Sequence, residues 1–481
     1  MYKLLLCWRY LLTRYLAFVC IISVMLGVAT LIVVNSVMGG FSTKLRERLH
    51  GLLSDIVIES TSLEGFHETP EQITKRIRGD KELSKRIKAI SPGMEVFAML
   101  QYEYRKRPID PPTVITRTVR VVGVDAKTRC KVGGFKEHLV RQKEKDVPSF
   151  AITEAMKKKY LKENIFSNPD ALQVFDPSPP PNPSVPPPPA PPPSKVKVPS
   201  GAIVGHLLAH FREKDEKTGK TKENPLLNPG DKVILTTVSG GKLMPVYDHF
   251  LVVDYFKSEM SEYDSNMVYV PLEDLQKLRS MENRVTSVQV SLHDYERDAQ
   301  FVKERLQKLF PQWYGYHVAT WEDKQGPLLA AISIERGILN ILLFMIVGVA
   351  GFGILSIFTM IVTEKTRDIG VMKALGASNR GVMSIFLSYG LLLGTVGAGL
   401  GTVLGVSLSN NINKVEQGLS KLTGTEVFSR DVYYFNEIPV DVQPMQIAMI
   451  IVGAIGIAVL FSILPALRAA MLHPVRALRY E

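Results

Sequence analysis

Few side chains in this sequence are spaced as an enzyme would need them. The chain has no G-x-x-x-x-G-K-[ST] nucleotide loop, no H-E-x-x-H pair, no Ser/His/Asp set and no cluster of cysteines and histidines. The nine histidines are scattered, and we expect His206, His210 and His249 to be structural. The sequence therefore predicts no catalytic residue and no metal site.

The segment best suited to recognition is EKTRDIGVMKALGASNRGV, Glu364 to Val382. Its helical pattern puts apolar or small residues on one side, namely Ile369, Met372 and Gly376. Charged residues surround them, namely Arg367, Asp368 and Lys373. Such a short amphipathic helix can dock in a groove of a soluble partner, although any cytoplasmic loop can hold one.

The elements on either side of this segment are long and free of charge. Charged residues are absent between Arg14 and Lys44, Arg336 and Glu364, Arg380 and Lys414, and Asp441 and Arg468. A helix needs about 20 mainly apolar residues to cross a bilayer, and each interval is long enough. Helices buried in a soluble core rarely run so far without a polar face. We predict four membrane spans and expect the first to be a retained anchor rather than a signal peptide.

Basic residues cluster at three places beside these spans. They are Lys3, Arg9 and Arg14; then Lys365, Arg367, Lys373 and Arg380; then Arg468, Arg476 and Arg479. The positive-inside rule makes all three segments, and so both termini, cytoplasmic. The same clusters account for the net charge of +11 without nucleic acid, because no zinc spacing or RNA-binding signature accompanies it.

The large region between the first two spans has mixed α and β character. Strand-like runs include DIVIES, MEVFAMLQYEY, VITRTVRVVGVD, GAIVG, DKVILTTV, FLVVDYF, MVYVP and VTSVQVSL. Thr69-Pro70-Glu71-Gln72 predicts a capped helix start, and we expect that helix to run to about Ile90. Cys130 is the only cysteine of this region, so it has no internal disulfide.

The third span contains three G-x-x-x-G pairs, formed by Gly390 and Gly394, by Gly397 and Gly401, and by Gly401 and Gly405. This spacing lets helix backbones approach closely, which predicts tight packing against partners that the sequence does not identify. The four charge-free intervals contain no Asp, Glu, Lys, Arg or His, whereas an ion-coupled carrier would normally place such side chains at membrane depth. We therefore expect the driving energy to enter elsewhere.

The predicted fold class is an α-helical integral membrane protein with a large α+β periplasmic domain inserted between helices 1 and 2. The predicted order is an interfacial helix at 1–14, a span at 15–40, the periplasmic domain at 41–334 with a proline-rich insertion at 176–199, a span at 335–363, a cytoplasmic coupling segment at 364–380, a span at 381–410, a periplasmic loop at 411–443, a span at 444–466 and a cytoplasmic tail at 467–481.

Several of these motifs resemble one family. EKTRDIGVMKALGAS resembles the loop between the second and third spans of MacB/FtsX-type permeases, and LPALRAAMLHPVRALRYE resembles their C-terminal end. VNSVMGGFSTKLRERLHG, EYDSNMVYVPLEDLQKL and DVYYFNEIPVDVQP are similar to segments of lipoprotein-releasing permeases of the LolC/LolE kind. The resemblance covers the chain from Asn35 to its last residue.

The resemblance implies a non-catalytic permease subunit of an ABC transporter in the bacterial inner membrane. Two such subunits, identical or related, would pair around a cytoplasmic ATPase dimer that binds ATP and Mg²⁺, and the periplasmic domain would move as a lever during lipoprotein release. The implied ATPase-coupling positions are Glu364, Arg367, Asp368, Ile369, Met372, Lys373, Gly376 and Ala377. Ile369 and Met372 would fill a groove of the ATPase, and the charged residues would pair with its surface.

Two features depart from lipoprotein-releasing permeases that recruit a periplasmic chaperone. Their outer-domain hairpin is an extended hook, whereas the matching hairpin here predicts a tight turn and involves Gly240, Gly241, Lys242, Leu243, Met244 and Pro245. The proline-rich insertion is the other departure. Export of another amphiphile, as in MacB, and transmembrane signalling without transport, as in FtsX, remain alternatives, and the sequence does not name the cargo.

Overall fold

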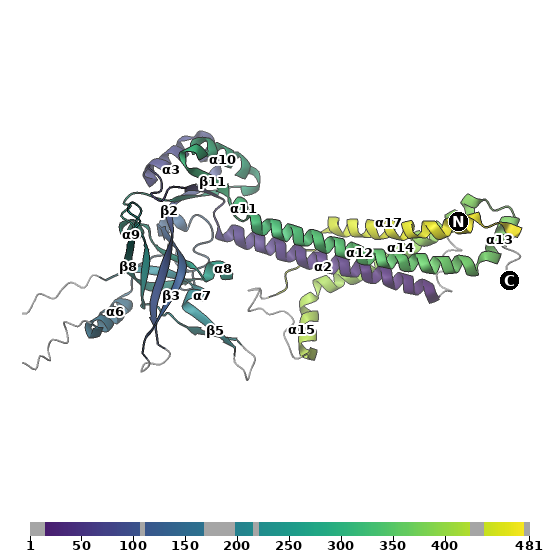
Figure 1. Cartoon of the computed structure of the whole chain (residues 1–481), viewed down its shortest axis with the longest axis horizontal. Coiled ribbons are helices and arrows are strands. Elements are labelled where there is room, and N and C mark those ends of the chain that lie inside the picture. The colour runs from purple at the N-terminus through teal and green to yellow at the C-terminus, as the bar shows by residue number, and fades with distance from the viewer. Residues whose placement is uncertain (1–14, 106–110, 168–197, 215–220, 424–436, 476–481) are drawn as a thin grey trace, which may run out of the picture. The chain divides into compact units, whose positions relative to one another are not determined.

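The computed structural model describes residues 15–105, 111–167, 198–214, 221–423 and 437–475 (Figure 1). The predicted interfacial helix at 1–14 and the proline-rich insertion as far as residue 197 lie outside these residues. The chain divides into two units, one of Glu47–Gly326 and one that combines Met1–Arg46 with Pro327–Glu481. The two units are described separately below.

A nine-stranded sheet dominates the Glu47–Gly326 unit, in the order β11-β1-β10-β2-β3-β9-β4-β8-β7. The strands are β1 (Ile56–Ser60), β2 (Ile87–Tyr104), β3 (Thr113–Val124), β4 (Ser200–Gly205), β7 (Lys232–Val238), β8 (Pro245–Phe256), β9 (Met267–Pro271), β10 (Ser287–Leu292) and β11 (Tyr316–Thr320). β5 (His210–Lys214) and β6 (Thr221–Pro225) form a separate pair. The β3–β9 and β4–β8 pairs are parallel, and the other pairs are antiparallel.

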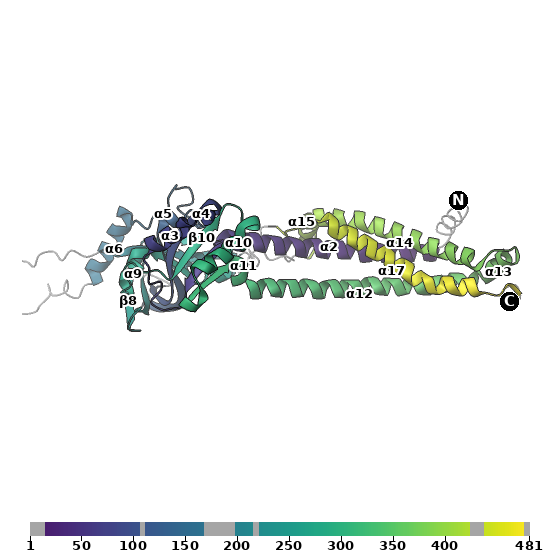
Figure 2. The same cartoon turned by 90° about the horizontal axis from the view of Figure 1, so that it is seen from above.

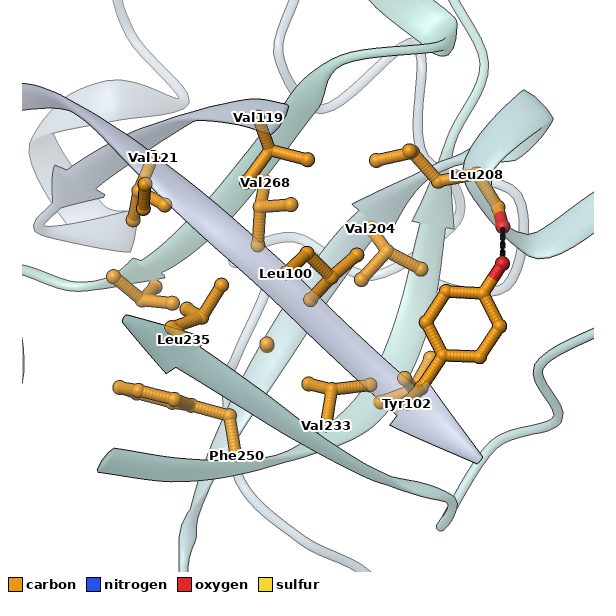
Figure 3. Packing of buried hydrophobic residues seen from close by; sticks show 14 of the residues in the cluster. Leu100, Tyr102, Val119, Val121, Val204, Leu208, Val233, Leu235, Phe250 and Val268 are labelled. Atoms are coloured by element: carbon orange, nitrogen blue, oxygen red, sulfur yellow. Dashed lines mark hydrogen bonds between the residues drawn. The ribbon is translucent and has the colours of Figure 1, made fainter. Parts of the chain in front are cut away.

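Part of this sheet closes on itself, because β2 pairs with β7 as well as with β3. Met99 of β2 lies opposite Thr236 of β7, and Gln101 lies opposite Ile234. The strands from β2 round to β7 therefore form a small barrel. Figure 3 shows the packed interior of this barrel, where Leu100, Val119, Val204, Val233 and Phe250 from different strands point toward one another.

The rest of the sheet, β11-β1-β10 and the start of β2, is covered by helices α3 (Pro70–Gly79), α4 (Lys81–Arg86) and α10 (Tyr295–Leu309) (Figure 1). A second core lies here and contains Ile73, Ile77, Val302 and Leu306 from the helices. The remaining elements of this unit are α5 (Ala126–Arg129), α6 (Glu154–Ser167), α7 (His206–Ala209), α8 (Ser261–Asp264), α9 (Leu272–Leu278), the 3-10 turn η2 (Gln312–Tyr314) and α11 (Trp321–Lys324).

The helix expected from Pro70 to about Ile90 is shorter than predicted. Its capping box is present at Thr69 and Gln72. Asp80 then adopts extended backbone angles, ends α3 and caps α4 through its carboxylate, which accepts from the Glu82 N–H at 3.0 Å. From Ile87 onward the chain pairs with β10, so the hydrogen bonds of the sheet override the local helical preference.

Four long apolar helices dominate the described part of the other unit: α2 (Tyr15–Leu52), α12 (Gly326–Glu364), α14 (Asn379–Asn410) and α17 (Pro444–Met471). Each is long and apolar enough to cross a membrane. In both views the membrane portions of α2, α14 and α17 run side by side (Figures 1 and 2). α2 and α12 extend beyond the predicted spans 15–40 and 335–363, and the predicted loop 411–443 contains helix α15 (Ile412–Thr423).

Candidate functional site

The segment between the second and third membrane helices forms helix α13 (Thr366–Ala374). Its end depends on Gly376, whose φ of +96° lies in the left-handed region that favours glycine. The backbone N–H of Ala377 donates to the Met372 carbonyl at 3.0 Å and closes the last turn. The Ser378 hydroxyl then accepts from the Gly381 N–H at 3.2 Å and caps α14. The chain therefore turns tightly from α13 into α14.

The apolar side of α13 packs against the membrane helices. Ile369 is 1% exposed and belongs to the core that α2, α12, α14 and α17 share. Met372 and Ala377 are partly buried and pack against the same core. Burial inside this unit removes Ile369 from water, so it is not available to fill a groove of a partner. Met372 keeps part of its surface exposed, and its predicted contact with a partner stays a prediction.

The opposite side of α13 presents a different set of residues. Arg367 and Asp368 are exposed, and so are Val371, at 43%, and Leu375, at 83%. Asp368 accepts a hydrogen bond from the Lys365 ammonium at 2.7 Å. Sequence reasoning missed Val371 and Leu375. The signal was present, because residues 367, 371 and 375 are four apart and share a helix face.

Two more predicted coupling residues are placed differently. Glu364 is exposed at the last position of α12. The Lys373 ammonium donates to the backbone carbonyls of Ala470, at 2.8 Å, and Leu472, at 2.5 Å. Its charge is therefore directed toward the end of α17 rather than toward a partner's surface.

The five predicted glycines of α14 lie where neighbouring helices come closest. Gly390 and Gly394 face α17, and a Cβ at Gly394 would lie 2.8 Å from the Ala458 methyl group. Gly397, Gly401 and Gly405 face α2, and a Cβ at Gly401 would lie 2.7 Å from the Met25 carbonyl oxygen. These glycines leave no side chain on α14 at the points where it meets α17 and α2. The backbone of α14 can therefore approach both helices closely.

A cavity of about 510 Å³ lies between α2, α12 and α17. Its lining combines polar and apolar side chains. The polar ones are Asn35, Arg336, Asn340 and Gln446, and the apolar ones include Phe344, Val347, Ala454 and Ile457. The Asn35 side-chain amide donates to the Leu31 carbonyl of its own helix at 3.0 Å. Sequence reasoning did not single out these residues, although amides inside or beside apolar helices are unusual enough to have marked them.

The end of α2 is held firmly within the Glu47–Gly326 unit. The Arg48 guanidinium donates to the Glu259 carboxylate at 2.6 Å, and the His50 Nε2 lies 2.6 Å from the Asp55 carboxylate. The His50 ring also stacks on Trp321 of α11, with ring centroids 5.3 Å apart. The start of this unit is thereby tied to the residues that lead into α12.

Burial shifts the pKa values of two charged groups near the end of α2, Arg48 and Asp264. Desolvation lowers the pKa of Arg48, although Glu259 partly opposes the shift. The Glu259 N–H in turn donates to Asp264 at 3.2 Å, and burial raises the pKa of the Asp264 carboxyl group. Among the described residues, no group of three or more His, Cys, Asp or Glu side chains is placed to hold a metal ion.

The predicted hairpin joins β7 to β8 through residues 239–244. Its base is fixed, since the Ser239 N–H donates to the Met244 carbonyl at 2.9 Å and the Gly240 N–H to the Arg279 carbonyl at 3.0 Å. Gly240 is needed for packing, because a Cβ there would lie 2.3 Å from the Met281 sulfur, whereas nothing lies near Gly241. Lys242, Leu243, Met244 and Pro245 are exposed.

An apolar surface continues from this hairpin onto the barrel. Phe97 and Met99 of β2 and Tyr247 of β8 are exposed. Met99 lies opposite Thr236, which lies opposite Tyr247, so the two exposed side chains share one face of the sheet. We call these residues, with Leu243 and Met244, the hairpin surface.

Comparison with known families identifies the membrane region. The chain matches the family described as FtsX-like permease C-terminal over residues 340–474. Residues 340–474 are therefore similar to the C-terminal domain of FtsX-like permeases. The match includes α13, α14 and α17, and it confirms the resemblance to MacB/FtsX-type permeases.

Individual relatives extend the likeness beyond this region. The lipoprotein-releasing system transmembrane protein LolC of Xylella fastidiosa is 30% identical over 52% of this chain and 61% of its own length. LolE of Haemophilus influenzae is 30% identical over 45% of this chain and 52% of its own length. The macrolide export ATP-binding/permease protein MacB of Bdellovibrio bacteriovorus is 30% identical over 41% of this chain and 29% of its own length. These matches therefore span less than two thirds of each relative.

One solved structure is also similar, the periplasmic region of MacB from Actinobacillus actinomycetemcomitans. It is 12% identical, and the match covers 59% of this chain and 97% of that one with a TM-score of 0.28. At so low a TM-score the likeness supports no conclusion about the fold.

The candidate sites divide at the border of the FtsX-like domain. The predicted coupling residues and the five glycines of α14 lie inside it, whereas the hairpin surface lies outside. The lining of the cavity includes residues on both sides of this border, because Arg336 precedes the domain and Asn340 is its first residue.

Proposed function

We propose that this chain is the permease subunit of an ABC transporter that releases lipoproteins from the bacterial inner membrane. The observation that carries the proposal is the cavity between α2, α12 and α17, which joins polar and apolar side chains in a chain similar to LolC and LolE. An amphiphile needs both kinds of contact, and about 510 Å³ lies within the usual range of ligand pockets.

In this proposal both termini and α13 are cytoplasmic, and the Glu47–Gly326 unit is periplasmic. The basic residues beside the spans support that orientation. ATP and Mg²⁺ bind to a separate ATPase dimer, because the sequence contains no nucleotide loop of its own. A second permease subunit, the same chain or a related one, completes the assembly.

The ATPase docks on the exposed side of α13. Val371 and Leu375 supply apolar contacts, and Arg367 and Asp368 flank them. Exposed apolar side chains between charged ones are typical of an interface core with a polar rim. This surface replaces Ile369, which the membrane helices bury, while Met372 is partly buried beside it.

The docking surface is tested by co-purification of the ATPase with V371D/L375D. We expect the ATPase to be lost, because two carboxylates would be buried without partners. V475D is the matched control, since Val475 is exposed beyond the end of α17, and it should retain the ATPase. Undiminished recovery with V371D/L375D would contradict the assignment.

The transport function is tested in proteoliposomes that contain the permease pair, the ATPase and a triacylated lipoprotein. ATP should release the lipoprotein, and A454W, which fills the cavity, should abolish release while ATPase binding persists. G456W is the control, because no atom lies within 4 Å of a Cβ at Gly456. Release of another amphiphile but no lipoprotein would favour MacB-like export. ATP-dependent change in the outer unit without any release would favour FtsX-like signalling.

The hairpin surface provides the contact for a periplasmic lipoprotein chaperone in this proposal. Its exposed Leu243 and Met244 suit a carrier that must accept acyl chains, and the fixed base of the hairpin holds them in place. L243S/M244S should weaken transfer to the chaperone, whereas L63S, at another exposed leucine, should not. Equal transfer by both variants would remove the hairpin from the mechanism.

A further inference from the structure

Lys373 makes a contact that the coupling role of α13 does not explain. Its ammonium group donates to the carbonyls of Ala470, at 2.8 Å, and Leu472, at 2.5 Å, about one hundred positions further along the chain. Ala470 lies in the last turn of α17, and Leu472 follows the last helical residue, Met471. A side chain of α13 thus binds the end of a helix that is not adjacent in sequence.

The sequence at the end of α17 leaves the Ala470 carbonyl in need of a donor. In a continuing helix the Ala470 carbonyl would accept from the N–H of residue 474, but that residue is Pro474, which has none. Carbonyls at a helix end also carry a partial negative charge. Lys373 supplies both the missing donor and the opposite charge.

The end of α17 is itself joined tightly to α14. Gly390 packs on Ser462, and a Cβ there would lie 2.5 Å from the serine hydroxyl. Gly394 packs on Ala458, and Ala466 and Ala469 are fully buried. α14 and α17 therefore have little room to slide past each other, so a force applied at the end of α17 displaces both helices.

We propose that Lys373 is the residue that transmits movement of α13 to the α14–α17 pair. The inference rests on the proposed function, in which the ATPase moves α13. Without the Lys373 contact, α13 remains attached to α12 and α14 through the chain and to the core through Ile369, but its docked position at the end of α17 is lost. Lys373 is a positioning residue in this role and does not touch the cargo.

The contact itself is tested without any ATPase. Spin labels on L375C and V475C, both at exposed positions, report the separation of α13 and the end of α17 in full-length protein whose native cysteines are replaced. K373M keeps the aliphatic stem but removes the charge, and we expect a broadened and shifted distance distribution. K373R should restore the distribution, and K365M, which removes the Lys365–Asp368 pair, should leave it unchanged.

Transmission is then tested with the ATPase present. K373M should still bind the ATPase but release lipoprotein at a rate roughly tenfold lower per ATP hydrolysed, a factor that matches the loss of a hydrogen bond from a charged group. K373R should recover release, and K365M should resemble the wild type.

The outcomes separate this inference from the proposed function. A K373M distance distribution that superimposes on the wild type overturns the contact. A changed distribution with normal release overturns transmission. If the wild-type protein releases no lipoprotein, the proposed function fails, and the spin-label measurement still decides whether Lys373 holds α13 to α17.

Discussion

The membrane helices and the barrel both exclude water, but they do so with opposite kinds of residue. In the barrel, large side chains such as Leu100, Val204 and Phe250 fill the interior (Figure 3). Between α14 and its neighbours, the closest approaches occur where a side chain is missing, at Gly394 and Gly401. The barrel gains stability from buried apolar area, whereas helices already in lipid gain it from close backbone contact.

This difference predicts which substitutions each unit tolerates. Removing atoms should be most harmful in the barrel, because a cavity forfeits both the transfer free energy and the contacts around it. Adding atoms should be most harmful at the glycines, because the backbone of a neighbouring helix has no space to yield. Matched pairs of variants in the two units should therefore respond in opposite ways.

The largest effect is expected for F250A in the barrel. Phe250 is fully buried in the centre of β8, and its removal should lower the free energy of unfolding by about 3–5 kcal/mol. Urea unfolding monitored by tryptophan fluorescence, to which the buried Trp321 of the same unit contributes, measures the loss. F97A is the control, since Phe97 is 71% exposed. Similar losses for the two variants would contradict the description of the barrel core.

A smaller but still clear effect is expected for G401L in α14. Its Cβ would lie 2.7 Å from the Met25 carbonyl oxygen, and the overpacking should cost about 1–3 kcal/mol. Thermal unfolding in detergent, with the yield of monodisperse protein, measures it. G399L adds the same side chain two residues away, where nothing lies within 4 Å, and should behave like the wild type. A harmless G401L would show that α2 and α14 do not contact at backbone distance.

Local patterns in the sequence predicted much of the fold. The runs GAIVG and MVYVP are strands β4 and β9, and Leu272 to Leu278 is helix α9 as expected. Thr69 and Gln72 form the predicted capping box. In each case neighbouring residues decide the structure, through β-branched side chains or a cap.

The failures occurred where distant segments decide the structure. Ile87 to Ile90 has a helical pattern but pairs with β10, some 200 residues later in the chain. The closure of the barrel by β2 and β7 has no local signal. For the candidate site, the amphipathic character of α13 was visible, but which of its faces is buried depends on the membrane helices around Ile369. The cavity depends on three helices that meet only in the fold.

The two units also differ in buried charge, which gives the smallest and most specific prediction. Among the described residues, the buried carboxylates are Asp55, Asp254 and Asp264, and all three belong to the Glu47–Gly326 unit. Burial raises the pKa of Asp254 and Asp264 above the ordinary value of 3.8. Mild acid should therefore affect the stability of the Glu47–Gly326 unit through these groups, and not that of the membrane helices.

The sign of the effect follows from proton linkage. Because its pKa is raised on folding, Asp264 holds more proton in the folded protein than in the unfolded chain at pH values just above 3.8. Its contribution to stability is present at low pH and is lost as the pH rises through the folded-state pKa. The loss should be small, since the Ser258 N–H and hydroxyl both donate to this carboxylate at 2.7 Å and favour its charged form.

Two variants with opposite expected slopes test this prediction. The stability of the wild type relative to D264N should fall as the pH rises above 3.8. Relative to D80N it should rise with pH below 3.8 and then level off, because the hydrogen bond from Arg305 lowers the pKa of Asp80 and so stabilises the charged form. Urea unfolding at a series of pH values, monitored by tryptophan fluorescence, measures both differences. Parallel slopes for the two variants would mean that burial does not govern the Asp264 carboxyl group, and the contrast in buried charge between the two units would then have no consequence for stability.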